Sequence, residues 1–308
     1  MRILVTGGAG FIGSQIVDAL IADGHAVSTI DNLATGVRAN VNPQARFYEA
    51  DIRDEAAVRA LFAHERPAVL VHQAAQLDVR RSVAEPAYDA DVNIVGTLRL
   101  LQAGVEHGLH KVLFASSGGA IYGDADTIPT PETYAAAPIS PYGAAKLSVE
   151  HYLHYYHVIH GLPYVALRYA NVYGPRQNPH GEAGVVSIFA ERLLRGEPAI
   201  IYGDGHNTRD YVYVGDVVAA NRLALASDRV GAYNVGTGAE TDVNDIFRRL
   251  NTLTEAQAVE QHGPAKAGEQ RRSCLDWGLI QRDLGWQPTV ALDEGLTRTV
   301  EFFADKVR

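Results

Sequence analysis

The first half of the chain alternates short apolar runs with longer stretches in which apolar residues recur every three or four positions. The runs have the length of strands and the longer stretches have helical spacing, a pattern that predicts parallel strands joined by helices. Strands are expected near residues 2–6, 26–30, 46–50, 68–72, 111–116 and 164–168. Helices are expected at 14–21, from 55, at 91–107 and at 142–160. The predicted fold class is therefore α/β, a doubly wound parallel sheet with a ligand-binding edge at the strand ends.

This rhythm breaks after Asn171, where residues 174–181 form a long irregular stretch rich in glycine and proline. Helical patterns follow at 185–195, from 216, at 242–253 and at 293–304, with a strand near Ala199. No linker of Gly/Ser/Pro composition separates two halves. We therefore expect a sheet domain over residues 1–172 and a smaller lobe made mainly of residues 173–308. Segments near 211–238 are expected to return to the sheet.

A cluster of glycines separates the first strand from the first helix. It reads as GxGxxG (Gly8, Gly10, Gly13) or as GxxGxxG (Gly7, Gly10, Gly13). Residues without Cβ let the backbone turn tightly and approach a pyrophosphate, which then lies at the positive end of the helix dipole. The second strand ends at Asp31, whose carboxylate suits an adenosine ribose and would repel a 2′-phosphate. The pattern predicts a bound dinucleotide, and NAD rather than NADP.

Charge and cysteine content narrow the range of partners. The formal net charge of the 308 residues is −9, which argues against nucleic acid or an anionic membrane as the main partner. The single cysteine, Cys274, cannot form an internal disulfide, which is typical of a reducing cytosol. No apolar run has membrane-spanning length. We expect a cytoplasmic protein that binds small molecules.

Tyr142 and Lys146 are one turn apart on an expected helix, so they share a face. A nearby ammonium lowers the pKa of a phenol, which allows tyrosine to act as a general base. Ser116 and Ser117 end the preceding strand at the edge where a nicotinamide would lie. A hydroxyl there can share a substrate hydrogen bond with the phenol, although a loop serine can equally cap the local backbone. Ser117, Tyr142 and Lys146 are the predicted catalytic residues.

Several segments resemble the extended short-chain dehydrogenase/reductase family, over essentially the whole chain. They read TGGAGFIG at 6–13, HQAA at 72–75, SSGGAIYG at 116–123, SPYGAAK at 140–146, LRYANVYGPR at 167–176 and RDYVYVGD at 209–216. Within this family the chain is most similar to UDP-glucose 4-epimerases. The resemblance implies an NAD-binding Rossmann domain over residues 1–172 and a mainly substrate-binding lobe over residues 173–308.

The resemblance also implies roles for individual residues. Those implied to bind NAD are Gly7, Gly10, Phe11, Ile12, Gly13, Asp31, Asn32, Asp51, Ile52, Ala74, Ala75, Asn93, Tyr142, Lys146 and Tyr169. Those implied to contact a UDP-sugar are Ser117, Tyr142, Asn171, Val186, Tyr202, Arg209, Lys266, Glu269 and Ser273. The planar fork of Arg209 independently suits a diphosphate.

The chain departs from the family pattern at three positions. Gly118 and Gly119 follow Ser117, where many epimerases carry a third hydroxyl residue. Gln76 stands in place of a lysine that commonly lies near the cofactor. Lys266 occupies the place of a second diphosphate-binding arginine, which keeps the charge but loses the bidentate fork.

Four histidines recur every third residue at 151, 154, 157 and 160. Steps of three drift around a helix, so all four cannot converge on one ion, and we predict no metal site. In the resembling family this helix pairs with its mate in a dimer. A homodimer through the helix at 142–160 is therefore expected.

The implied function is an NAD-dependent nucleotide-sugar 4-epimerase that interconverts UDP-glucose and UDP-galactose through a transient 4-keto sugar. Alternatives are a 4,6-dehydratase or decarboxylase of the same superfamily, or a non-catalytic NAD-sensing protein. A dehydratase needs an acid–base pair directly after the catalytic hydroxyl, where this chain has Gly118 and Gly119. A protein that only senses NAD has no need to keep Ser117, Tyr142 and Lys146 together.

The small side chain of Ser273 falls where resembling epimerases wall the pocket beside the sugar's 2-substituent. The 2-N-acetyl sugars are therefore possible substrates, unless Arg271 or Arg272 folds inward and fills the gap.

Overall fold

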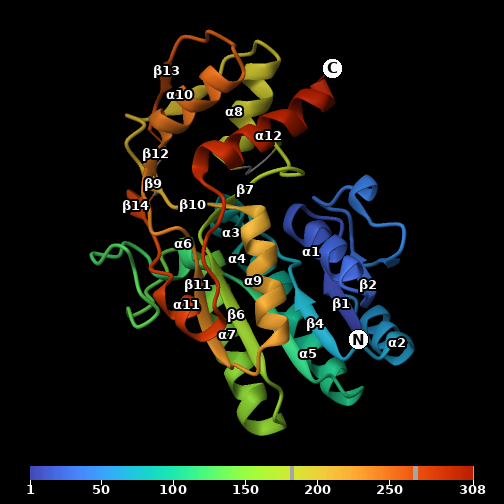
Figure 1. Ribbon diagram of the computed structural model, residues 1–308. Coiled ribbons are helices and arrows are strands. Elements are labelled where there is room, and N and C mark those ends of the chain that lie inside the picture. Colours follow the sequence, from blue (N-terminus) through green and yellow to red (C-terminus); the bar gives the residue numbers. More distant parts are fainter. Residues whose placement is uncertain (181–183, 266–269, 308) are drawn as a thin grey trace.

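The computed structural model describes residues 1–180, 184–265 and 270–307, and its central element is a parallel sheet of seven strands in the order β11-β6-β5-β4-β1-β2-β3 (Figure 1). The strands are β1 (Arg2–Thr6), β2 (Ala26–Asp31), β3 (Arg46–Glu49), β4 (Val69–His72), β5 (Lys111–Ser117), β6 (Tyr164–Tyr169) and β11 (Gly231–Val235). Strands β2 and β3 lie on one side of β1, and β4, β5, β6 and β11 follow in that order on its other side. The switch point between β1 and β4 is where ligands of such sheets bind.

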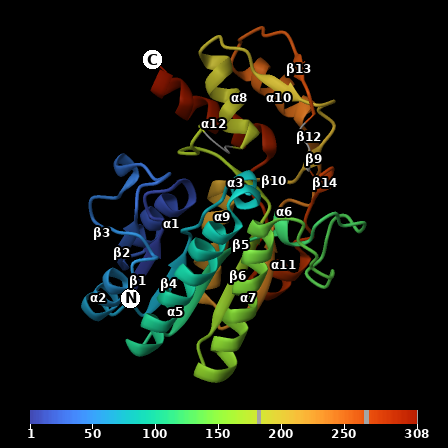
Figure 2. The same ribbon diagram turned by 180° about the vertical axis from the view of Figure 1, so that it is seen from behind.

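Helices cover both faces of the sheet, because successive strand residues point to opposite sides and both sides are apolar. One face packs against α1 (Phe11–Ala22) and α9 (Val214–Ala226), which lie in front in Figure 1. The other face packs against α2 (Glu55–Glu65), α5 (Gly96–Glu106) and α7 (Pro141–His160), of which α5 and α7 lie in front in Figure 2. The predicted Rossmann-type α/β fold is confirmed.

The helix expected at 91–107 begins earlier and is interrupted. After α3 (Val79–Ala84), α4 spans Pro86–Ala90, a π-helical turn spans Asp91–Val95, and α5 follows at Gly96–Glu106. Pro86 at the first helical position is the start signal that the apolar spacing alone did not reveal. This arrangement places Asp89 and Asn93 in the protein interior.

A smaller lobe lies beyond the carboxyl ends of the sheet strands (Figure 1). Its helices α8 (Val185–Leu194), α10 (Val243–Leu253) and α12 (Leu292–Val307) share a separate apolar core. Short strands connect the lobe to the sheet domain: β7 (Asn171–Tyr173) with β10 (Tyr211–Tyr213), β8 (Ile200–Tyr202) with β13 (Gln261–Gly263), and β9 (Thr208–Arg209) between β12 (Thr241–Asp242) and β14 (Arg272–Ser273). The remaining short helices are η1 (Arg38–Asn40), α6 (Gly118–Ile121) and α11 (Gly278–Leu284).

Within the described ranges, no helix combines the length and apolar character needed to cross a lipid bilayer.

Candidate active site

The glycine-rich loop between β1 and α1 has room only for glycine at its turning points. Gly7 has a φ of +69°, and a Cβ there would lie 2.8 Å from the amide nitrogen of Ala74. A Cβ on Gly13 would lie 2.1 Å from the carbonyl oxygen of Gly7. No side chain caps the start of α1 after Gly10, which leaves the first N–H groups of Phe11 and Ile12 for an anion. These features fit the pyrophosphate of a dinucleotide.

Asp31 ends β2 with its carboxylate almost wholly buried. One oxygen accepts a hydrogen bond from the N–H of Ala9 at 3.0 Å and the other from the N–H of Leu33 at 2.8 Å. Burial raises the pKa of this carboxyl, and the two backbone donors oppose that rise. A cavity of about 300 Å³ lies between Ala9, Thr35 and Val37 on one side and α8 and α12 of the smaller lobe on the other, and Asp31 does not line it. The two backbone N–H groups thus hold the Asp31 carboxylate in place at the end of β2.

Asn32 and Asp51 follow β2 and β3 and are joined by a hydrogen bond of 2.8 Å from the Asn32 amide to an Asp51 oxygen. Hydrogen bonds from Arg53 lower the pKa of Asp51 to about 2. Ile52 is buried in the core beneath them. The polar pair therefore lies next to Asp31 at the sheet edge, where the sequence predicts the adenosine half.

Ser117, Tyr142 and Lys146 come together at the carboxyl end of β5. Ser140 caps α7 by accepting a hydrogen bond from the N–H of Gly143, which places Tyr142 in the first turn. Burial raises the pKa of Tyr142 to about 12, against a hydrogen bond with Ser117 that lowers it. Lys146 is only 4% exposed and donates to the carbonyl of Ala115 at 2.8 Å. Burial lowers the pKa of its ammonium to about 8.

A buried ion pair between Glu150 and Arg168 distinguishes the roles of Ser116 and Ser117. Ser116 donates to Glu150 at 2.5 Å, and Glu150 also accepts two hydrogen bonds from Arg168, at 3.0 and 2.6 Å. Arg168 donates further to the hydroxyl of Tyr122 at 2.8 Å. Ser116 is thus committed to the interior, whereas Ser117 faces Tyr142.

The residues expected to contact substrate are distributed between β7, β9, β14 and the smaller lobe. Ser273 is 7% exposed and pairs with Arg209 in the parallel β14·β9 ladder. A Cβ placed on Gly119 would lie 3.7 Å from Asn171 Oδ1 and 3.9 Å from Ser273 Oγ, so these groups surround the same space after Ser117.

Two further residues that were expected to contact substrate lie apart from Asn171 and Ser273. Val186 is buried in the lobe core and Tyr202 is exposed at the end of β8. Lys266 and Glu269 lie outside the described residues.

Comparison with known proteins shows the family of the chain. The model of the NAD dependent epimerase/dehydratase family matches residues 3–236. The chain belongs to this family.

The chain is 46% identical to a UDP-glucose 4-epimerase of Mycolicibacterium smegmatis over 314 residues, which cover 99% of each chain. The crystal structure of the Thermotoga maritima UDP-glucose 4-epimerase with UDP-glucose is 50% identical, with a TM-score of 0.99 over 100% of both chains. The Thermus thermophilus UDP-glucose 4-epimerase complex with NAD is 47% identical, with a TM-score of 0.93 over 98% of this chain and 99% of the other.

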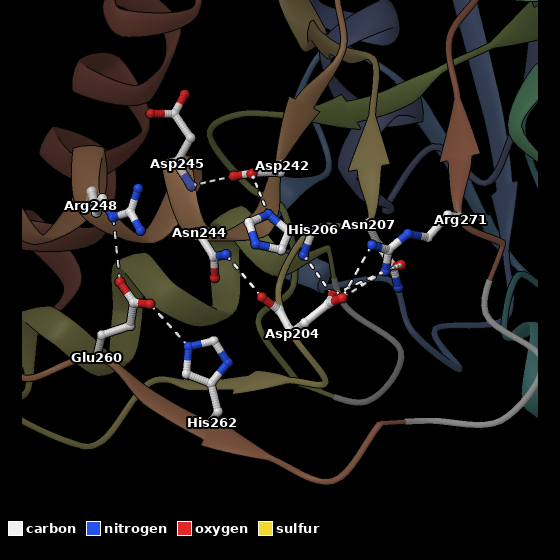
Figure 3. A network of polar contacts seen from close by, with 10 residues as sticks. All are labelled: Asp204, His206, Asn207, Asp242, Asn244, Asp245, Arg248, Glu260, His262 and Arg271. Atoms are coloured by element: carbon white, nitrogen blue, oxygen red, sulfur yellow. Dashed lines mark hydrogen bonds and ion pairs between the residues drawn. The ribbon is translucent and has the colours of Figure 1, made fainter.

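In this epimerase/dehydratase chain the two arginines beside Ser273 are engaged in ion pairs with acidic side chains. Arg271 makes bidentate contacts with Asp204, of 3.0 Å from Nη1 and 3.1 Å from Nη2, as Figure 3 shows. Arg272 is paired with Glu240, with 2.9 Å between Nε and Oε1. Bidentate pairs of this kind fix both side chains in direction. Neither arginine fills the space beside Ser273.

Two polar clusters lie near the carboxyl ends of β6 and β4. Tyr169 ends β6, and its hydroxyl accepts hydrogen bonds from Gln73 at 3.3 Å and from Asn221 at 2.8 Å. Asn93 donates to the carbonyl of Gln76 and accepts from the N–H of the same residue, both at 2.9 Å. Its remaining N–H meets Asp89. The sequence analysis missed Asn221 and Asp89, because neither stands in a recognisable motif.

Among the described residues of this family member, no group of three or more His, Cys, Asp or Glu side chains is placed to hold a metal ion.

Proposed function

We propose that this chain is a nucleotide-sugar 4-epimerase that interconverts UDP-glucose and UDP-galactose with retained NAD. The observation that carries the proposal is that Ser117 at the end of β5, Tyr142 in the first turn of α7 and Lys146 on the carbonyl of Ala115 meet at the same strand edge as the glycine-rich loop. The full-length similarity to UDP-glucose 4-epimerases supports the choice of substrate. A charged nucleotide sugar and the single buried Cys274 both suit a cytosolic enzyme.

The chain's own residues supply proton transfer and orientation. NAD, when bound, takes two electrons and the C4 hydrogen from the hexose and gives them back in the same turnover. Tyr142, as phenolate, takes the proton of the 4-hydroxyl and later returns it, while Ser117 bridges the phenol and the sugar oxygen. Burial raises the pKa of Tyr142, and the Lys146 ammonium, 5.7 Å from the centre of the phenol ring, together with the positive charge of bound NAD would oppose that rise and so favour the phenolate. Because the 4-keto sugar is held mainly by its nucleotide, it can turn and regain hydrogen on the opposite face. The reaction is then a net isomerisation.

A 4,6-dehydratase is a poorer fit to the residues that follow Ser117. That reaction needs an acid and a base at these positions. A Cβ on Gly118 would lie 2.4 Å from Leu275 Cδ1, so no side chain fits there without displacing Leu275. Gly119 opens towards Asn171 and Ser273 and itself offers no proton donor. An epimerase needs no group at either position.

The purified protein is expected to convert UDP-galactose to UDP-glucose without added NAD. An enzyme that restores its cofactor in every turnover does not have to release it, so NAD should copurify. Denaturing the protein and assaying the supernatant for NAD and NADP tests this together with the activity. Recovery of NADP, or activity only with a continual supply of NADH, would contradict both the role of Asp31 and the epimerase assignment.

The pocket beside Ser273 is expected to admit 2-N-acetyl sugars. The serine side chain is small, and Arg271 and Arg272 are held outside by Asp204 and Glu240. Wild type should therefore interconvert UDP-GlcNAc and UDP-GalNAc as well as the unmodified pair. Ser273→Tyr should lower kcat/KM for the acetylated sugars by at least about tenfold relative to UDP-glucose, since a filled pocket excludes the acetyl group. Ser273→Ala is the matched control, and an unchanged ratio in Ser273→Tyr would show that this residue is not the pocket wall.

The exposed face of α7 supports a homodimer. Val158 and Ile159 are 63% and 62% exposed, and Tyr152 and Tyr155 lie near them on the same helix. An apolar helix face of this kind suits a second copy across a twofold axis. Ile159→Glu should dissociate the dimer at micromolar concentration, as measured by sedimentation velocity. Val259→Glu, at a site in the other lobe that is even more exposed (78%), is the control. A wild-type monomer would contradict the proposal.

A further inference from the structure

Asp89 is a buried carboxylate that the proposed mechanism does not use. Its side chain is 1% exposed. One oxygen, Oδ1, accepts hydrogen bonds from the side-chain amides of Gln76 at 2.9 Å and Asn93 at 3.0 Å. The other oxygen, Oδ2, has no hydrogen-bond partner within the described parts of the chain. A buried carboxylate with a free oxygen is costly unless a nearby positive charge compensates it.

The neighbouring helix α7 carries a positive charge, on Lys146. The helix α4, which carries Asp89, packs directly against α7, which carries Tyr142 and Lys146. The charge of Asp89 acts on both of these groups: it raises the pKa of the Lys146 ammonium and also that of the Tyr142 phenol. Asp89 is therefore electrostatically part of the site, although no sequence motif marks it.

The other groups that face Lys146 do not replace this anion. Glu150, one turn further along α7, also favours the charged ammonium, but its carboxylate is already paired with Arg168. His72 on β4 is neutral, because burial first and the Lys146 charge second lower its pKa to about 3. Tyr142 is protonated until its pKa is reached. Asp89 is then the acidic group acting on Lys146 that lacks a cationic partner of its own among the contacts of the described residues.

We propose that Asp89 is a positioning residue of the active site: a buried anion that balances the Lys146 ammonium while its hydrogen bonds fix Gln76 and Asn93 at the cofactor edge. Its effect on turnover rests on the proposed function, whereas its effect on the charge of Lys146 does not. The direction of both effects follows from Coulomb's law. Removing the anion makes Lys146 lose its proton at lower pH and makes Tyr142 ionise at lower pH. Both limbs of a pH–rate profile should move in the same direction, towards acid.

The chain offers a direct measurement because it contains only four lysines, Lys111, Lys146, Lys266 and Lys306. With lysine labelled by ¹³C at Cε, an NMR titration of the NAD-loaded protein resolves each midpoint, and Lys146→Arg assigns the signal. Asp89→Asn keeps the size of the side chain and removes its charge. The Lys146 midpoint is expected to fall by about one pH unit or more, the usual effect of an adjacent charge.

Asp91→Asn is the matched control, since Asp91 is half exposed, is paired with Arg53, and does not act on Lys146. The midpoint of the Lys146 titration in Asp91→Asn should equal that in the wild-type protein. If Asp89→Asn fails to fold, Gln76→Lys places a cation against Asp89 and should lower the Lys146 midpoint in the same direction.

An unchanged midpoint in folded Asp89→Asn, or in Gln76→Lys if it alone folds, would overturn the proposal, because a purely structural role does not move the titration of Lys146. The pH dependence of kcat for UDP-galactose is the second readout and should shift to lower pH in the same variant. A shifted midpoint in a protein without epimerase activity would support Asp89 and contradict the proposed function.

Discussion

Replacing Tyr142 with phenylalanine is expected to slow C4 epimerisation by about 10²–10⁴-fold, the usual contribution of a general base. The chain should remain folded with NAD bound, because the phenol hydroxyl contacts Ser117 while the ring stays in the first turn of α7. The measurement is kcat for UDP-galactose, together with the NAD content of the purified variant.

Tyr152→Phe is the control for this experiment, since Tyr152 lies on the same helix but on the exposed face that we propose for the dimer, away from Ser117. It should turn over at the wild-type rate. If Tyr142→Phe does the same, the base lies elsewhere. If Tyr142→Phe loses NAD and unfolds at lower temperature, the hydroxyl is structural and not catalytic.

Glu150→Ala is expected to lower the free energy of unfolding by about 3–5 kcal/mol, because it leaves a buried guanidinium without its anion. Glu150 and Arg168 are 8% and 10% exposed, and the pair also holds Ser116. Because the loss reflects unpaired charge, the Glu150→Leu/Arg168→Leu double variant should be more stable than the sum of the single changes predicts. Urea denaturation measures all of these values.

The exposed residue Glu294 provides a comparison for the loss of unfolding free energy in Glu150→Ala. It pairs with Arg298 on the surface of α12, where both side chains are about half exposed. Glu294→Ala should cost less than about 1 kcal/mol, as exposed pairs do. Equal losses in Glu150→Ala and Glu294→Ala would mean that the buried pair contributes no more to stability than a surface pair.

The parts of the fold that follow from periodicity could be predicted from the sequence. Strands such as Val69–His72 are continuous apolar runs, and α7 starts with a serine cap followed by proline, so both have local signals. The glycine-rich loop is likewise recognised from local sequence, because a close approach of the backbone to a pyrophosphate requires glycine. Asp31 is recognised because ribose binding requires a carboxylate at the end of the second strand.

The elements that depend on distant contacts could not be predicted in this way. The short helix α6 opens with Gly118 and Gly119, which are poor helix formers, and packs against Leu275 from far along the chain. The π-helical turn before α5 buries Asn93 between Gln76 and Asp89, a set of contacts that no local pattern specifies. Asp89 looks like an ordinary surface acid in the sequence. Its environment is created only when α4 packs on α7.

The parallel pairing of β14 with β9 sets Ser273 opposite Arg209. Backbone hydrogen bonding fixes that register and holds neighbouring strands about 4.8 Å apart, whatever side chain stands at position 273. The proposed grip on the diphosphate and the proposed limit on the sugar thus lie side by side on one small sheet. On that proposal, a lineage could change its sugar preference through a single codon for residue 273 while the backbone pairing that positions Arg209 stays as it was.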